Sequence, residues 1–306
     1  MTDLPPGVGC WSRRRATIRI ASASLLAGLS PTLAESKVIG LAPEDFAVIL
    51  NLRTGWIDQI WHPQQLDRRQ APPASLAKLV TAAIALESGL TNPARRIPCP
   101  GWFQPPGSPS TQRLACWDHR GHGSLNLVEA LAHSCNVHFY TLGRELGRQR
   151  LWQGLEQFGL GNGDYSGQAP LLAVGEDPHL QVNGWQLLRL IALIARQGQG
   201  IPEGDITFPS LPLADSIWQT LTAGMVAATQ IGTAQGIGDS GQAIAVKTGT
   251  SARLAHPQWA EDFQAWLGAF WPAQDPLWAM LLYLHRGKAY QGGIGLARQI
   301  ITAQSN

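Results

Sequence analysis

The fold is organised around the stretch Pro72-Pro73-Ala74-Ser75-Leu76-Ala77-Lys78-Leu79-Val80-Thr81-Ala82-Ala83-Ile84-Ala85-Leu86-Glu87. Two prolines stop the element before it, and the apolar spacing that follows predicts a helix over residues 74–87, ended by Gly89. Ser75 and Lys78 are three residues apart, and residues at i and i+3 share one face of a helix. The stretch therefore predicts a hydroxyl and an amine side by side at the start of a helix.

Such a pair has chemical meaning because a serine hydroxyl is a poor nucleophile until a neighbouring base takes its proton. A lysine can act as that base only when it is neutral, a state that burial and a second nearby cation favour by lowering its pKa. Lys247 is the candidate for the second cation. Ser75 also opens the helix, where free N–H groups and the helix dipole stabilise developing negative charge.

Two further motifs accompany this pair, Ser134-Cys135-Asn136 and Lys247-Thr248-Gly249-Thr250. Taken singly, each of the three motifs has a common structural interpretation. The Ser75–Lys78 pair could be a helix N-cap with a snorkelling lysine, Ser134 and Asn136 a polar pair between helices, and Lys247-Thr248-Gly249 a turn. However, the chain contains only four lysines, and two of them lie in these motifs. The combination predicts that three segments, on a helix, a second helix and a strand, meet in one site.

The order of elements indicates the fold class. Strands are expected at 46–52 and 56–61 as a hairpin, and again at 243–247, 265–271 and 278–284. Helices are expected at 74–87, 125–147, 149–158, 182–196, 216–228 and 293–303, with residues 91–124 irregular. We therefore expect an α/β (α+β) fold, in which both chain ends build an antiparallel sheet flanked by helices and a helical lobe is inserted between them.

Composition and the N-terminal segment bear on class and location. The chain has 306 residues, 14% of them charged, with a net charge of +2. The charge argues against nucleic-acid binding, and the length fits one large domain or two intimately packed lobes. Arg13, Arg14 and Arg15 precede an apolar run over 16–29, which predicts an export signal in residues 1–34 cleaved after Ala34. An uncleaved anchor and a disordered tail are the alternatives. Export would place the domain of residues 35–306 in the periplasm or on the outer face of the cytoplasmic membrane.

The cysteines suggest a disulfide rather than a metal. None of Cys10, Cys99, Cys116 and Cys135 has the paired spacing of a structural zinc site, so the sequence predicts no metal. In an exported chain, Cys99 and Cys116 would be the pair able to form a disulfide, and a free state is the alternative. Cys135 is interpreted as a small buried residue.

These motifs resemble those of the serine penicillin-recognising family, and within it the transpeptidase domains of class B penicillin-binding proteins. The likeness covers most of residues 40–300. The matching segments are Pro73-Ala74-Ser75-Leu76-Ala77-Lys78, Cys116-Trp117, Gly121-His122-Gly123, Ser134-Cys135-Asn136-Val137-His138-Phe139-Tyr140, Phe158-Gly159-Leu160-Gly161, Gly232-Thr233-Ala234 and Lys247-Thr248-Gly249-Thr250.

The resemblance implies a β-lactamase/transpeptidase-like fold, no cofactor, and a serine acyl-transferase acting on D-Ala-D-Ala stem peptides of peptidoglycan. Ser75 would be the nucleophile, Lys78 the general base and Ser134 the proton relay. Substrate would be held by Asn136, Lys247, Thr248, Gly249 and Thr250, with the backbone N–H groups of Ser75 and Thr250 as the oxyanion hole. Implied ligands and partners are the stem peptides, β-lactam antibiotics, and a cell-wall glycosyltransferase or morphogenesis complex.

Two alternatives stay open. A serine β-lactamase of class D also carries Pro-Ala-Ser-x-x-Lys, although such enzymes have a valine where this chain has Asn136. A non-catalytic scaffold or β-lactam sensor of the same fold is the other reading. A scaffold would be expected to have lost Ser75 or one of the two lysines, and a sensor would need transmembrane helices coupled to a signalling domain.

Overall fold

A computed structural model describes residues 40–109, 111, 113–161, 167–238, 241–252 and 262–305. The predicted export signal, residues 1–34, lies outside the described residues. Within the described part of the chain, no helix is long and apolar enough to cross a membrane. The strands are β1 (Phe46–Asn51), β2 (Ile57–Trp61), β3 (Ile97–Cys99), β4 (Trp102–Phe103), β5 (Leu114–Ala115), β6 (Gly123–Leu125), β7 (Ala245–Ala252), β8 (Phe263–Trp271) and β9 (Trp278–Leu284).

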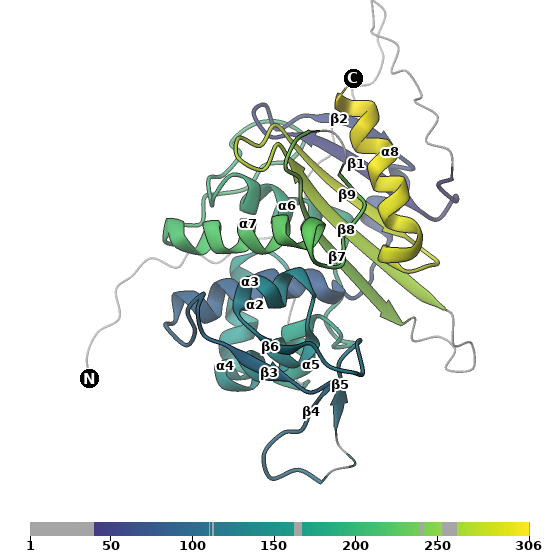
Figure 1. Cartoon of the computed structure of the whole chain (residues 1–306). Helices are drawn as coiled ribbons and strands as arrows, with labels where there is room; N and C mark the ends of the chain where they lie inside the picture. Colours follow the sequence, from purple (N-terminus) through teal and green to yellow (C-terminus); the bar gives the residue numbers. More distant parts are fainter. Residues whose placement is uncertain are drawn as a thin grey trace, which may run out of the picture. The chain divides into compact units, whose positions relative to one another are not determined.

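The main sheet has five antiparallel strands in the order β2-β1-β9-β8-β7 (Figure 1). The N-terminal hairpin β1–β2 is joined to the C-terminal strands through β1 and β9, where Phe46 pairs with Tyr283. This confirms the prediction that both chain ends build one antiparallel sheet. Strand β7 forms one edge of the sheet, and this edge turns out to be where the site lies.

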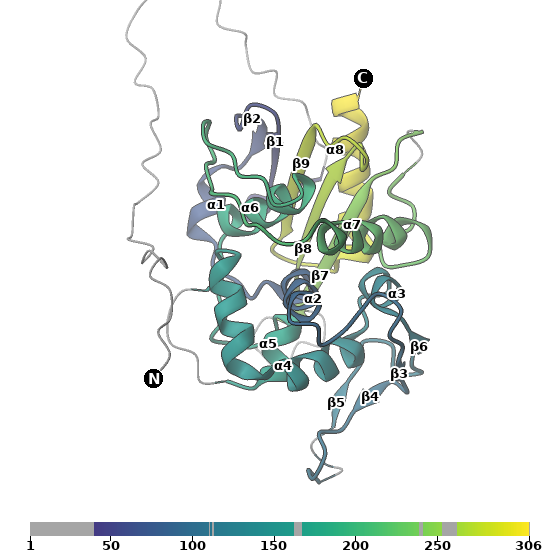
Figure 2. The same ribbon diagram turned by 90° about the vertical axis from the view of Figure 1, so that its left-hand side faces the viewer.

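Helices surround the sheet and form a separate lobe. They are α1 (Gln64–Arg68), α2 (Ala77–Glu87), α3 (Leu127–Ala132), α4 (Asn136–Gln157), α5 (Ala169–Val174), α6 (Gly184–Ala195), α7 (Asp215–Gln230) and α8 (Ile294–Ser305), with short turns of helix at η1 (Ala74–Leu76) and η3 (Ala289–Gly293). In Figures 1 and 2, α2, α3, α4 and α5 gather with strands β3–β6 beyond the β7 edge of the sheet. This is the predicted helical lobe.

Each face of the sheet has its own core because side chains alternate along a strand. On β1, Phe46 and Val48 pack into the large core shared with α6, whereas Ala47 packs into the core under α8. Helix α6 approaches β8 closely: a methyl group at Gly268 would lie 2.4 Å from Cδ1 of Ile191. Two packed layers of helix therefore hold the sheet and fix the position of β7.

The structure corrects several predicted elements. The helix expected over 125–147 is broken at residues 133–135, between α3 and α4, and α4 itself bends at Gly147, whose backbone is not helical. Helices α1 and α5 were not predicted. Strand β7 runs to Ala252, beyond the predicted end at Lys247. Residues 91–124, expected to be irregular, include the short strands β3–β6.

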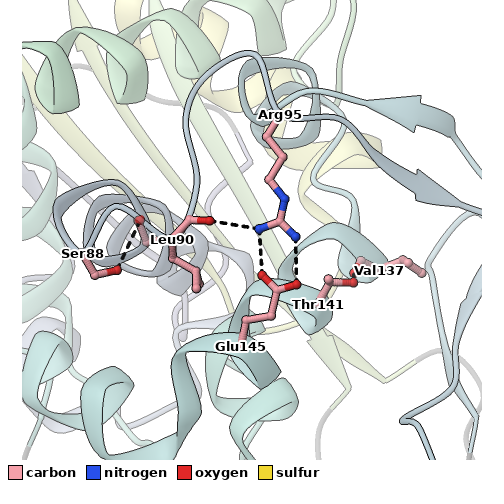
Figure 3. Close-up of polar contacts among 7 residues, drawn as sticks. Ser88, Leu90, Arg95, Val137, Thr141 and Glu145 are labelled. Carbon is pink, nitrogen blue, oxygen red and sulfur yellow. Dashed lines mark hydrogen bonds and ion pairs between the residues drawn. The ribbon is translucent and has the colours of Figure 1, made fainter.

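A partly buried ion pair holds the lobe together. Arg95 donates both of its terminal nitrogens to the carboxylate of Glu145 on α4, each at 2.8 Å, and also donates to the carbonyl oxygen of Leu90 at 3.1 Å (Figure 3). A two-pronged arginine–carboxylate pair restricts geometry as well as attracting charge. It therefore ties the segment before β3 to the first half of α4.

Candidate active site

Ser75 lies in the turn η1, immediately before α2, and is half-buried. The turn is held from two sides. Trp266 of β8 donates its indole N–H to the carbonyl oxygen of Pro72 at 2.9 Å, and Ala74 donates its backbone N–H to Gly175 at 3.0 Å. Ala74 has a φ of 49°, in the left-handed region that non-glycine residues seldom adopt. The surrounding contacts thus present Ser75 on a constrained turn rather than on a regular helix.

Lys78 is fully buried, and its amine points to the loop between α3 and α4. Its Nζ donates to the carbonyl oxygen of Ser134 at 2.7 Å and to Oδ1 of Asn136 at 2.6 Å, and lies 3.2 Å from Oγ of Ser134. Among the described residues, Lys78 shares no hydrogen bond with the Ser75 hydroxyl. Burial lowers the pKa of Lys78 to about 8, and the charge of Glu176 is the largest influence in the opposite direction.

Lys247, also fully buried, approaches the same hydroxyl from β7. Its Nζ donates to Oγ of Ser134 at 2.9 Å and to the carbonyl oxygen of Thr248 at 2.8 Å. Burial, and then the charge of Lys78, lowers the pKa of Lys247 well below its usual value. Ser134 Oγ therefore lies between two buried amines. Keeping both amines charged near neutral pH would cost free energy, because each is desolvated and the two charges repel each other.

The edge strand β7 packs directly on the serine turn. A methyl group at Gly249 would lie 3.2 Å from the backbone nitrogen of Ser75 and 3.0 Å from a methyl of Leu76. Glycine at this position thus permits the close approach of β7 to η1. Next along the strand, the Thr250 hydroxyl accepts the backbone N–H of Ala289 at 3.3 Å.

The structure brings all eight sequence-predicted residues onto three segments that meet: η1 with α2, the α3–α4 loop, and β7. It also adds Thr233, whose hydroxyl lies 2.6 Å from that of Thr248 and whose backbone N–H is bonded to Ala132 at the end of α3. The sequence did point to Thr233, because Gly232-Thr233-Ala234 is one of the segments that carry the family resemblance, but no role was assigned to it. Glu176, which influences Lys78, was assigned no role from the sequence.

Beside this site lies a cluster of three cysteines and a histidine. The Sγ atoms of Cys99, Cys116 and Cys135 and a ring nitrogen of His122 all lie within 4.8 Å of one another. Nδ1 of His122 is 3.5 Å from Sγ of Cys99 and 3.5 Å from Sγ of Cys116. The three cysteines are buried and free, so of the two alternatives left open for Cys99 and Cys116, a disulfide or free thiols, the structure has free thiols.

The cluster has the dimensions of a metal site, which the sequence did not predict. Zn–S bonds of about 2.3 Å and Zn–N bonds of about 2.0–2.1 Å in a tetrahedron place sulfur and nitrogen about 3.5 Å apart. This is the separation between His122 and its two nearest sulfurs. Cys99, Cys116, His122 and Cys135 therefore fit a zinc ion. The sequence did not reveal this cluster, because its four residues come from four separate segments and lack the close spacing of a zinc-binding motif.

A serine turn beside two buried lysines, on this sheet and with this helical lobe, is the arrangement of the penicillin-recognising class of serine proteins. Residues 47–304 match the family model of the penicillin binding protein transpeptidase domain, and the chain belongs to that family. The resemblance drawn from the sequence motifs is thereby confirmed.

Known relatives agree with this assignment. The chain is 26% identical over 225 residues to the peptidoglycan D,D-transpeptidase MrdA of Acinetobacter baumannii, covering 59% of this chain and 33% of MrdA. It thus spans about a third of that relative. Similar solved structures include the complex between Penicillin-Binding Protein (PBP2) and MreC from Helicobacter pylori, with a TM-score of 0.71, 18% identity and coverage of 86% of this chain and 61% of that one.

A second similar structure is the penicillin G acyl-enzyme complex of penicillin-binding protein A from M. tuberculosis. It has a TM-score of 0.65 and 23% identity, and the match covers 85% of this chain and 74% of that one. At these identities the two structures establish the fold of this chain, which is the β-lactamase/transpeptidase-like fold expected from the sequence.

Proposed function

We propose that this chain is a peptidoglycan D,D-transpeptidase that works through an acyl-enzyme on Ser75. The observation that carries the proposal is the Ser134 hydroxyl held between the amines of Lys78 and Lys247, next to the constrained turn of Ser75. Two fully buried amines within reach of one hydroxyl cost folding free energy, since each charged form must be desolvated. Proton transfer at that point is the function that explains why they are there.

The acylation step follows from these contacts. A neutral amine has two N–H groups and one lone pair. If Lys78 donates its two N–H groups to the Ser134 carbonyl and to Asn136, its lone pair is left to accept a proton. The oxygen of Ser75 then bonds to the carbonyl carbon of the penultimate D-Ala, and the hydroxyl proton passes to Lys78.

Collapse of the tetrahedral intermediate completes the transfer. The C–N bond to the terminal D-Ala breaks, and Ser134, hydrogen-bonded to both amines, passes its hydroxyl proton to the leaving nitrogen while it takes up the proton that Lys78 had accepted from Ser75. The amine of an acceptor stem peptide then attacks the ester and regenerates the Ser75 hydroxyl; water in place of that amine would give carboxypeptidase action.

The substrate contacts are assigned to β7 and α4. Lys247, Thr248 and Thr250 would bind the terminal carboxylate, where Gly249 keeps the strand close to the serine turn. Asn136 would bind a substrate amide. The backbone N–H groups of Ser75 and Thr250 would stabilise the oxyanion, usually the largest contribution to such a reaction.

Ligands, partners and location extend the proposal. The ligands would be D-Ala-D-Ala stem peptides and β-lactams, in line with the acyl-enzyme formed by the M. tuberculosis protein. A cell-wall glycosyltransferase or a morphogenesis protein would be the partner, in line with the H. pylori complex with MreC. These substrates lie outside the cytoplasm, so we place the domain in the periplasm or on the outer face of the cytoplasmic membrane.

Incubation of the purified chain with a fluorescent penicillin tests the nucleophile. A covalent band that survives denaturation is expected for the wild type and for the control Ser88→Ala, a serine at the end of α2, and not for Ser75→Ala. Consumption of the antibiotic without a stable band would instead identify a β-lactamase. With a stem pentapeptide and a D-amino acid acceptor, exchange of the terminal residue indicates transpeptidation, whereas release of D-Ala alone indicates carboxypeptidase action.

A further inference from the structure

Lys288 is a further cation near the edge strand that carries Lys247, and the acylation steps make no use of it. Its Nζ lies 4.5 Å from the centre of the Phe263 ring and 6.0 Å from the centre of the Tyr290 ring. An ammonium group is attracted to the negative face of an aromatic ring. Within the part of the chain that the structure describes, Lys288 forms no salt bridge. Two rings, rather than an acidic side chain, therefore fix the position of this amine.

The segment that carries Lys288 is attached to the main sheet on both sides of the lysine. Before it, Gly287 donates its backbone N–H to the carbonyl oxygen of Phe263 at 2.8 Å, at the start of β8. After it, Ala289 donates its backbone N–H to the hydroxyl of Thr250 on β7 at 3.3 Å. Thr250 is one of the residues assigned to the substrate. Lys288 therefore lies between two contacts that hold it beside the substrate-binding edge of the sheet.

The order of the assigned contacts along β7 gives the direction in which a donor peptide continues. Its contacts begin with the terminal carboxylate at Lys247, and its scissile carbonyl lies at the backbone N–H of Thr250, further along the strand. The rest of the peptide then continues toward Ala252, where β7 ends. Because an extended chain advances by about 3.3 Å per residue, the residue before D-Ala-D-Ala lies beside this end of β7. Ala252 pairs with Phe263, and the Phe263 ring holds the Lys288 amine.

The chemistry of this place favours an anionic group. An ammonium group has three N–H donors, and its contacts with ring faces leave them available for hydrogen bonds. The Lys288 side chain is half-buried and Tyr290 is 52% exposed, so a ligand can reach the amine from solvent. A carboxylate there gains a charge-assisted hydrogen bond, whereas an amine is repelled.

We propose that Lys288, held on the ring of Phe263 beside Tyr290, binds a carboxylate on the side chain of the residue that precedes D-Ala-D-Ala in the donor peptide. The inference rests on the proposed function and deepens it, since it names the class of donor that the site selects. Lys288 is then a specificity-determining residue for the acylation step.

Two penicillins that differ in one group test this role. The acylamino side chain of a penicillin stands where the preceding residue of a donor peptide would lie. One penicillin carries an adipoyl side chain, which ends in a free carboxylate, and the other ends in a carboxamide of the same shape. Competition with fluorescent penicillin measures both acylation rates. The wild type should prefer the carboxylate about 3- to 10-fold, the range between an exposed ion pair and a charge-assisted hydrogen bond.

Substitutions assign that preference to one amine. Lys288→Met should abolish it and leave acylation by the carboxamide unchanged, and Lys288→Arg should retain most of it. Arg286→Met is the matched control, because Arg286 is an exposed cation two residues before Lys288 and outside the proposed contact. Equal acylation rates for the two penicillins in the wild type would overturn the inference. So would a preference that survives in Lys288→Met, because the lysine would then merely cover the Phe263 ring.

Binding without chemistry separates this inference from the proposed function. In Ser75→Ala, ligand-observed NMR titration compares adipoyl-D-Ala-D-Ala with its terminal carboxamide. The carboxylate peptide should bind about 3- to 10-fold more tightly, and the added substitution Lys288→Met should remove the difference. If the wild type is never acylated, the proposed function fails, and this titration still decides the role of Lys288. Normal acylation with equal affinity for both peptides refutes the role of Lys288 and leaves the proposed function intact.

Discussion

The charge of the buried lysine pair should govern the pH dependence of acylation. Burial lowers the pKa of Lys78 to about 8, and that of Lys247 is lowered as well, so the pair loses a proton near neutral pH. Because both amines contact Ser134 Oγ, the observed midpoint belongs to the pair rather than to one residue. For a midpoint near 8, the neutral fraction of the base is about 9% at pH 7 and about 90% at pH 9.

The expected result is therefore a roughly tenfold rise in the second-order acylation rate between pH 7 and pH 9. The rise has this sign because lysine is a base only in its deprotonated form, which becomes populated as the pH increases through its pKa. Stopped-time labelling with fluorescent penicillin at limiting concentration measures the rate, with spontaneous hydrolysis of the probe subtracted at each pH.

A single substitution makes the prediction sharper. Glu176 is the largest charge that opposes the lowering of the Lys78 pKa, so Glu176→Gln should move the midpoint to lower pH and raise the rate at pH 7. Protein surrounds the Glu176 carboxylate on most sides, but the side chain still reaches water, which screens its charge. The expected change is at most about one pH unit. A rate that is flat or falls between pH 7 and 9, or a midpoint that moves upward in the variant, would refute the assignment of a neutral lysine as base.

Three further predictions concern single contacts. Lys247→Met should reduce acylation at least about 100-fold, because it removes the amine that contacts Ser134 Oγ and that is assigned to the substrate carboxylate. The melting temperature should stay the same or rise, as expected when a buried amine is replaced by an apolar side chain. Gly175→Ala should destabilise the fold by about 1–3 kcal/mol in urea unfolding, because its φ is 71° and the new methyl would lie 2.2 Å from the Ala74 carbonyl oxygen, and acylation should slow as the Ser75 turn moves. Arg95→Ala and Glu145→Ala should each lower the free energy of unfolding by about 1–2 kcal/mol. The double variant should lower it by less than the sum of the two single effects. Strictly additive effects would mean that the ion pair in Figure 3 does not contribute to stability.

Local rules predicted the elements with strong periodicity, and they selected candidate site residues on three segments that the structure brings together. The two chain-end groups of strands, α6 and α8 were expected within a few residues of where they lie, because apolar spacing reports burial directly. Because the chain has only four lysines, the two that lie in the motifs, Lys78 and Lys247, could be recognised as candidate site residues. The break at residues 133–135 was not predictable in this way, since the run from Leu127 to Val137 contains no helix breaker.

Tertiary contacts decided that break and the cluster beside it. Residues 133–135 leave the helix where the buried Lys78 amine takes the Ser134 carbonyl, a contact 56 residues distant in sequence. The cysteines and the histidine of the Cys99/Cys116/His122/Cys135 cluster share no motif, since they come together only when β3, the segment between β5 and β6, and the α3–α4 loop fold against one another. A short-range sequence pattern does not predict such contacts, because the free energy that stabilises them comes from the packing of segments that are distant in the sequence.

From its sequence alone, the chain indicated which residues are candidates for the chemistry and which segments build the sheet, because residue type and period act locally. Only the tertiary structure decided that both lysine amines contact the hydroxyl of Ser134 rather than that of Ser75. It also decided that β7 packs on the serine turn at Gly249. Likewise, Cys99 lies close to both Cys116 and Cys135 as a free thiol instead of forming a disulfide with Cys116. Those outcomes depend on burial and on contacts between distant segments, which exist only after the lobe and the sheet have packed together.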